Sequence, residues 1–327
     1  MSAARLFQSA LCALASTLIG VAPASVSLAQ DTWPSRPVKL IVPSSPGGGT
    51  DVFGRLLAQA LSDTTKQSFF VENRPGASGN IGAQAAANAP KDGYTFLVAS
   101  NSSTAINLYL YKELQFDPRK ELAPVARGVY AISVLIVNND LKAHSVPEFI
   151  ALAKKEPGAL AYGTPGTGSA PYLGVRMLEE LAGLKFTHAP YKGIGPAYQD
   201  LIAGRLQFIY ADLASALPFV QSGKVRALAV DRKTSLLPNV PTLAESGVPK
   251  FDAPISFSVL GPVGVPEPVV KRMAEDVQKA LKAIAPRLEQ VALVPVYDTP
   301  AEFAASLAQE RAMWSAFIKR NAITAEQ

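Results

Sequence analysis

The sequence is poor in the residues that enzymes and metal proteins most often use for chemistry. Its 327 residues contain one cysteine, Cys12, and two histidines, His144 and His188. Two distant histidines without cysteine partners supply too few ligands for a zinc site. Neither a GxSxG nucleophile elbow nor an HExxH sequence occurs. The sequence therefore assembles no recognisable reaction centre.

Charge is scarce as well. Charged residues make up 17% of the chain, the formal net charge is +5, and basic residues occur at most in adjacent pairs. Nucleic-acid binding requires a basic stripe, so this class of function is disfavoured. Apolar residues make up 48%, which is enough for substantial cores and excludes wholesale disorder. The length favours about two domains.

The first thirty residues have the pattern of an export signal. Arg5 carries the only charge, Leu11–Val21 is a mostly apolar stretch, and Ser27–Ala29 offers small residues to a signal peptidase. The stretch is too short for a membrane span, which needs ~20 apolar residues. We therefore expect residues 1–29 to be a signal peptide cleaved after Ala29, or alternatively after Ala24. The mature protein would be periplasmic and free of cysteine, with a net charge of +4.

Short apolar runs alternate with helical patterns along the rest of the chain. The predicted strands are Lys39–Val42, Ser68–Val71, Thr95–Val98, Val134–Val137, Leu206–Tyr210 and Arg226–Val230. Between them, Val52–Leu61 carries one apolar stripe, which is typical of a helix. The alternation predicts an α/β protein with mainly parallel sheets and helices on both faces.

Helix starts are marked by capping boxes. Ser145-x-x-Glu148 and Thr299-x-x-Glu302 predict two of them, and Thr242-x-x-Glu245 predicts a shorter helix. Pro268 is expected to be the first residue of another helix. The inner face of that helix should consist of Val270, Met273, Val277, Leu281 and Ile284.

Each half of the chain has a strand that runs into a glycine-rich loop and then a helix. The first loop is Pro43–Asp51 (PSSPGGGTD) and the second is Gly163–Ser169 (GTPGTGS). Free N–H groups and the positive dipole end at a helix start favour an anion, and glycine allows close approach. Two such loops that face one cleft would hold a small anion, such as an acid with a carboxylate at each end.

A nucleotide phosphate is the other anion to consider. A P-loop needs a lysine before its last Ser or Thr, and the dinucleotide pattern needs a third glycine; neither loop meets its requirement. Tight turns without any ligand remain an alternative for each loop taken singly. Asp51, which opens a helix, is first a capping residue and dipole partner. His144 should lie at the surface, and His188 should be a half-buried histidine with satisfied hydrogen bonds.

Motifs along nearly the whole mature chain resemble those of the Bug-type substrate-binding proteins. These are the extracytoplasmic receptors of bacterial tripartite tricarboxylate transporters. The resemblance is carried by Trp33-Pro34-x-Arg36-Pro37, Pro46-Gly47-Gly48-x-x-Asp51, Val71–Ala77 (VENRPGA), Gly79–Ala83, Asp92–Thr95, Ala105–Asn107, Pro190–Gly193 (PYKG), Ser215–Pro218, Val240–Thr242 and Pro266–Val270.

The resemblance implies a two-lobed α/β periplasmic binding protein of type II, with the ligand in the cleft between the lobes. The first lobe would comprise residues 30–131 plus 254–327, and the second lobe residues 132–253. The resemblance also implies no cofactor and no catalysis. The ligand would be a small carboxylate, held largely by backbone N–H groups and hydroxyls, with cleft closure as the working motion.

Transferred by position, the ligand-binding residues come from several loops. They are Ser44, Ser45, Gly47, Gly48, Gly49, Asp51, Asn101, Ser102, Ser103, Thr164, Thr167, Gly168, Ser169, Tyr191 and Asp212. Asn107 is expected in support, Lys192 as a surface cation and Arg74 as a structural residue that braces a turn.

Three positions depart from the family pattern, namely Tyr172, Ser256 and the shifted acid Asp212. If Asp212 reaches the cleft, its carboxylate can receive an ammonium or amide N–H, which favours an amino acid or a pyridine-type acid over a plain dicarboxylate. The expected partners are membrane transporter subunits. The alternative partner is a sensor kinase that reads the liganded form, and an exported enzyme is the third and least favoured hypothesis.

Overall fold

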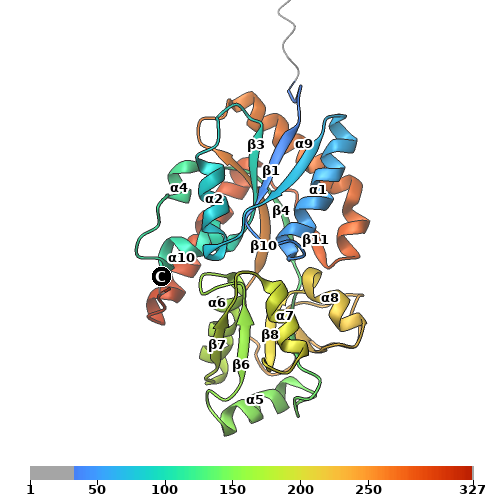
Figure 1. The fold of residues 1–327 in the computed structure, drawn as a ribbon, viewed down its shortest axis with the longest axis vertical. Helices are drawn as coiled ribbons and strands as arrows, with labels where there is room; N and C mark the ends of the chain where they lie inside the picture. The colour runs from blue at the N-terminus through green and yellow to red at the C-terminus, as the bar shows by residue number, and fades with distance from the viewer. Residues whose placement is uncertain (1–32, 326–327) are drawn as a thin grey trace, which may run out of the picture. The chain divides into compact units, whose positions relative to one another are not determined.

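The computed structural model describes residues 33–325, which form two β-sheets flanked by helices (Figure 1). The predicted signal peptide and its cleavage sites lie outside these residues. None of the helices within this range is long and apolar enough to cross a membrane.

A six-stranded sheet forms the first lobe, with the strand order β11-β4-β10-β3-β1-β2. Its strands are β1 (Val38–Val42), β2 (Phe69–Asn73), β3 (Thr95–Ser100), β4 (Leu122–Ala131), β10 (Ile255–Pro262) and β11 (Leu293–Pro295). β1 pairs in parallel with β2 and β3, whereas β10 is antiparallel to β3 and β4, and β11 to β4.

A five-stranded sheet forms the second lobe, with the order β7-β6-β8-β5-β9. Its strands are β5 (Ser133–Val137), β6 (Ala161–Thr164), β7 (Thr187–Pro190), β8 (Phe208–Asp212) and β9 (Arg226–Val230). β6 is parallel to β7 and β8, and β5 is antiparallel to β8 and β9.

Helices and short turns cover both sheets. They are α1 (Gly49–Thr65), η1 (Ala77–Gly79), α2 (Asn80–Ala87), η2 (Ser102–Ile106), α3 (Asn107–Leu110), α4 (Pro118–Glu121), α5 (Val146–Lys155), α6 (Ala170–Ala182), α7 (Ile194–Ile202), α8 (Leu213–Gln221), α9 (Glu267–Glu289) and α10 (Pro300–Arg320). In Figure 1, α2 lies to the left of β1 and β3, and α1 lies to the right.

The prediction of mainly parallel sheets is wrong, because the sheets are mixed. The cause lies in the segments that pass between them. β4 ends at Ala131 and β5 begins at Ser133, so the chain enters the second sheet with a single residue between. It returns through β10, which pairs antiparallel with both β3 and β4. Consecutive parallel strands need a crossover of a dozen or more residues, usually a helix, and the passage from β4 to β5 has none.

All six predicted strands are present, although β8 begins two residues later than predicted. The Ser145 and Thr299 boxes open α5 and α10 as expected. The Thr242 box forms both of its hydrogen bonds with Glu245, but only turns follow, so the predicted short helix is absent. Pro268 is the second residue of α9, so the helix begins at Glu267, one residue before the predicted start.

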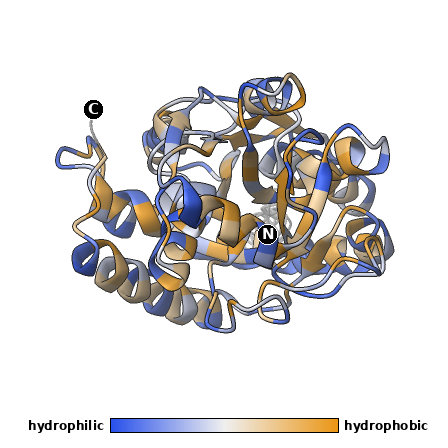
Figure 2. Cartoon of the chain, turned by 90° about the horizontal axis from the view of Figure 1, so that it is seen from below, coloured by the Kyte–Doolittle hydropathy of each residue, from blue (hydrophilic) through white to orange (hydrophobic). Residues whose placement is uncertain are grey.

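The amphipathic stripes read from the sequence face the core. Figure 2 shows hydrophobic and hydrophilic residues alternating along the helices. In α1, Phe53 and Leu57 are fully buried, and in α9 Met273, Val277 and Leu281 are fully buried. Burial of each such side chain contributes about 1.5–3 kcal/mol, which fixes both helices on the six-stranded sheet and so positions the loops that precede them.

Candidate functional site

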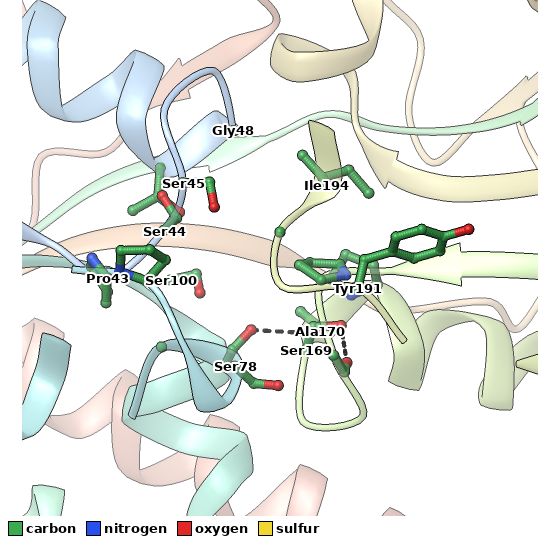
Figure 3. Close-up of a pocket in the computed structure, with 18 of the residues that line it drawn as sticks. Pro43, Ser44, Ser45, Gly48, Ser78, Ser100, Ser169, Ala170, Tyr191 and Ile194 are labelled. Carbon is green, nitrogen blue, oxygen red and sulfur yellow. Dashed lines mark hydrogen bonds between the residues drawn. The ribbon is translucent and has the colours of Figure 1, made fainter. Parts of the chain in front are cut away.

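A cavity of about 320 Å³ lies between elements of the two sheets. This volume is at the lower end of the range for small-molecule sites, ~300–1,000 Å³. Figure 3 shows Ser44, Ser45 and Ser78 on one side of the cavity, and Ser169, Ala170 and Ile194 on the other. Both glycine-rich loops line it, so the structure brings together the two loops that the sequence singled out.

The carboxyl ends of the parallel strands point at this cavity from both sheets. Pro43 follows β1 and Ser100 ends β3 on one side; Pro165 follows β6, and Pro190 and Asp212 end β7 and β8 on the other. Ligands of α/β proteins bind outside the carboxyl ends of strands, where the following helices begin. The topology therefore places the cavity where this fold class binds its ligands.

Among residues 33–325, four helices begin at the wall of the cavity. α1 starts at Gly49, α6 at Ala170, α7 at Ile194 and α8 immediately after Asp212. Each directs the positive end of its dipole toward the cavity. No arginine lines the cavity in the described part of the chain, and the one lysine, Lys192, is exposed. The electrostatic attraction for an anion thus comes mainly from the backbone.

The first glycine-rich loop leaves backbone donors free. Gly48 is the N-cap residue of α1 and provides no side-chain cap. The amides of Gly49 and Thr50 donate no hydrogen bond to any group in residues 33–325. The hydroxyl of Ser44, also in the wall, is buried and has no hydrogen-bond partner within the described chain. These groups can therefore donate hydrogen bonds to a ligand bound in the cavity.

Asp51 braces this loop from behind and does not line the cavity. Its carboxylate accepts hydrogen bonds from the amide of Gly47 (3.0 Å), from Arg55 (3.0 Å) and from Asn73 (2.8 Å). Burial opposes ionisation, but these hydrogen bonds outweigh it and hold the pKa of Asp51 below its usual value. Gly47 adopts a left-handed backbone (φ +83°), which explains why the turn uses glycine there.

The second glycine-rich loop is already engaged by hydroxyls of the first lobe. The amide of Gly168 donates to Ser78 Oγ (3.1 Å), and the amide of Ala170 donates to Ser102 Oγ (2.9 Å). Ser169 caps α6 by accepting from the amide of Tyr172. The start of α6 therefore serves more as a contact between the lobes than as a free anion site.

The segment Pro75–Gly79, which our sequence reasoning left out of the site, forms part of the wall. Ala77 and Ser78 both have positive φ (45° and 52°), which is costly for residues other than glycine. Asn107 holds the segment by donating from its amide to the carbonyl of Ser78 (3.1 Å). Such strain tends to occur at functional sites, but no sequence pattern predicts a left-handed Ser78.

A third loop, Pro190–Ile194, supplies the remaining wall of the second lobe. The side chain of Tyr191 points away from the cavity in Figure 3, and its hydroxyl donates to Asp200 (2.5 Å). The hydroxyl of Ser45 crosses to this loop and donates to the carbonyl of Lys192 (3.2 Å). The amide of Ile194, at the uncapped start of α7, donates to no group in the described range.

Asp212 is the only acidic residue of the cavity wall within the described chain. Its side chain caps α8, where Oδ1 accepts from the amide of Ser215 (2.9 Å). Asp212 is 8% exposed, and burial raises the pKa of its carboxyl group above the usual value.

The predicted ligand-binding residues divide into two groups. Those that line the cavity are Ser44, Ser45, Gly48, Gly49, Ser102, Thr167, Ser169, Tyr191 and Asp212. Those that lie outside the lining are Gly47, Asp51, Asn101, Ser103, Thr164 and Gly168. Wall residues absent from the prediction include Ser78, Ser100, Tyr111, Ile194, Ile255 and Phe257.

Several residues outside the lining have evident structural roles. Asn101 donates to the carbonyl of Pro254 (2.9 Å) and to Glu310 (2.6 Å), and thereby ties the loop after β3 to α10. Thr164 Oγ1 is 2.7 Å from His188 Nε2, so the predicted half-buried, hydrogen-bonded histidine is confirmed. Burial and the charge of Arg176 lower the pKa of His188 to about 4.

Two α/β lobes with a ligand-sized cavity between them define a two-lobed solute-binding protein. The chain matches the family described as "Tripartite tricarboxylate transporter family receptor" over residues 53–323, and it belongs to this family. The predicted resemblance to Bug-type receptors is thereby confirmed. BugT of Bordetella pertussis is 34% identical over 315 residues, which cover 94% of this chain and 96% of BugT.

Two solved structures of relatives carry acids. A protein of R. palustris solved with adipate has a TM-score of 0.86 and 33% identity, and the match covers 89% of this chain and 99% of that one. MatC from Rhodopseudomonas palustris, with bound malate, has a TM-score of 0.81 and 27% identity, over 87% of this chain and 99% of MatC. The chain is thus a solute-binding receptor by family and by fold.

Proposed function

We propose that the protein is a periplasmic receptor that captures a small organic carboxylate and delivers it to the membrane subunits of a tripartite tricarboxylate-type transporter. The observation that carries this proposal is the convergence of helix starts from both lobes on one cavity, where the amides of Gly49, Thr50 and Ile194 donate to no group among residues 33–325. A carboxylate oxygen is the acceptor that such amides lack.

The charge balance of the cavity supports an anion of modest charge. Each helix start stabilises a nearby negative charge by about 0.3–1 kcal/mol, and by up to ~2 kcal/mol where solvent is partly excluded. Because arginine is missing from the described wall, recognition rests on directed N–H and hydroxyl donors. The adipate and malate in the two relatives are acids of the corresponding size and chemistry.

The lobes are expected to move as units. We assign residues 30–131 and 254–327 to the first lobe and 132–253 to the second, and the division of the strands between two sheets supports this proposal. Contacts such as Gly168 to Ser78 and Ser45 to Lys192 join elements of different lobes and would form on closure. Release of the ligand then requires that these contacts break.

Transport without chemistry is the role that we assign. Nucleophile and base do not occur as a hydrogen-bonded pair in the described cavity wall, so no reaction is proposed. Family membership favours transporter subunits over a sensor kinase as the partner. Export through a signal peptide over residues 1–29 would place the protein where such subunits can receive it.

A thermal-shift screen of the mature, refolded protein tests carboxylate capture. A ligand that binds only the folded state stabilises it by RT ln(1 + [L]/Kd), which is about 2.7 kcal/mol at a hundredfold excess over Kd. Refolding first removes any ligand retained during purification. We expect a clear shift with one class of carboxylic acid and none with matched amides or alcohols. No shift with any acid would refute the proposal.

A further inference from the structure

One acceptor in the cavity wall remains unexplained by carboxylate capture alone. Asp212 Oδ1 accepts the amide of Ser215, but Oδ2 accepts no hydrogen bond from any residue in the range 33–325. Asp212 is 8% exposed and belongs to the cavity lining. A helix cap needs only one carboxylate oxygen, so capping does not account for the second. When a bound ligand excludes water from the cavity, an acceptor in the wall is costly to leave without a donor unless the ligand supplies one.

Asp212 lies directly beside the free donors of α1. A Cβ atom added to Gly49 would lie closest to Asp212 Oδ1, 2.5 Å from Cγ and 2.8 Å from Oδ2, so the whole carboxylate faces Gly49. The amides of Gly49 and Thr50, which would bind a ligand carboxylate, therefore lie next to the carboxylate of Asp212. A plain dicarboxylate in this position would bring two like charges together, and these repel strongly where water is excluded.

A ligand that carries an N–H donor next to its carboxylate satisfies both the free amides of α1 and the carboxylate of Asp212. The carboxylate then accepts from the amides at the start of α1, while the neighbouring amino group donates to Asp212. An amino group far along the ligand would not fit as well, because donor and acceptor positions adjoin across the contact between Gly49 and Asp212. Neighbouring sites in the wall require neighbouring groups in the ligand.

We infer that the receptor is selective for 2-amino carboxylic acids, with Asp212 as the residue that accepts a hydrogen bond from the amino group. This inference rests on the proposed capture of a carboxylate and narrows it to a class. It assigns to Asp212 a specificity role besides its role as the cap of α8.

The test compares pairs of acids that differ only in the 2-amino group. Isothermal titration calorimetry of the refolded, full-length mature protein would use L-aspartate with succinate, L-glutamate with glutarate, L-2-aminoadipate with adipate, and L-phenylalanine with 3-phenylpropionate. The range of sizes separates chain length from the amino group. For the best-bound pair, we expect the amino acid to bind at least tenfold more tightly than its partner.

The variant Asp212→Asn keeps the shape of the side chain and an oxygen that caps α8, but removes the negative charge. We expect it to weaken binding of the amino acid and to strengthen binding of the plain acid, so that their ratio falls at least tenfold. Asp212→Ser, which also caps helices, serves as a second variant should the first fold poorly. Asp117→Asn is the matched control, since Asp117 caps α4 away from the cavity, and its ratio should equal that of the unchanged protein.

Three results would overturn the inference. Equal or tighter binding of the plain acid by the unchanged protein would contradict the preference itself while leaving carboxylate capture intact. An unchanged ratio in folded Asp212→Asn would remove Asp212 as its cause. Binding of neither member of any pair would refute carboxylate capture and this inference together.

Discussion

The close approach of Gly49 and Asp212 predicts a variant that separates ligand binding from folding. Gly49 belongs to α1 and Asp212 to the cap of α8, so their contact joins the two lobes. A methyl group on Gly49 would lie 2.5 Å from the Asp212 Cγ, whereas carbon atoms in contact are normally ~3.5–4.0 Å apart. Gly49→Ala should therefore push the lobes apart at the cavity.

The expected loss of ligand affinity follows from the overlap between the added methyl group and Asp212. Inserting a methyl group into a well-packed contact costs about 1–3 kcal/mol. Since about 1.4 kcal/mol corresponds to a tenfold change, Kd should rise roughly five- to 150-fold. Folding itself should not suffer, because Gly49 is not one of the positive-φ residues and alanine is the better helix former. The free energy of unfolding without ligand should stay the same or rise slightly.

Calorimetry and urea denaturation of the same samples measure both quantities. Gly195→Ala is the matched control, because Gly195 also lies in the first turn of a helix, and an added Cβ there meets nothing within 4 Å. Wild-type affinity in Gly49→Ala would refute the reasoning that this contact forms in the liganded state. A large loss of stability would show that the clash arises within one lobe instead.

Two further predictions concern the hydroxyl contact between the lobes and a buried histidine. Ser78→Ala removes the acceptor of the Gly168 amide. Since a hydrogen bond contributes about 0.5–1.5 kcal/mol, the ligand affinity measured by calorimetry should fall roughly two- to twelvefold. Unchanged affinity would show that this contact plays no part in closure. Folding lowers the pKa of His188 from 6.5 to about 4, so the unfolded chain binds a proton that the folded chain does not, and stability is lost as the pH falls through this window. The free energy of unfolding of the unchanged protein should therefore fall by about 2–3 kcal/mol more between about pH 7 and pH 4.5 than that of His188→Gln. Urea denaturation at several pH values measures this difference, and parallel pH profiles of the two proteins would contradict it.

The strands that could be predicted are those with continuous apolar runs. β1, β5 and β9 are of this kind. β4 (LAPVARGVYA) was missed because proline, arginine and glycine interrupt it, and its pairing with β10 and β11 supplies what local sequence does not. The passage of the chain between sheets, which makes both sheets mixed, is a tertiary feature with no local signal.

Glycine and hydroxyl residues at strand ends predicted two of the loops that line the cavity. Ser78 could not be predicted as a wall residue, because its left-handed backbone depends on Asn107 and on Gly168 of the other lobe rather than on its neighbours in sequence. Asp51 and Thr164 were predicted as ligand contacts, whereas their polar atoms turn inward to brace loops. Spacing identifies which loop is functional but not which atoms of it face the cavity.

A crystal structure of the refolded protein with its best-binding acid tests the central claim most directly. We predict that a ligand carboxylate lies in the cavity between the lobes, with its oxygens within hydrogen-bond distance (~2.7–3.2 Å) of the amides of Gly49 or Thr50 and of Ile194. A ligand bound at another surface, or one in the cavity whose carboxylate makes no contact with these helix starts, would contradict the account.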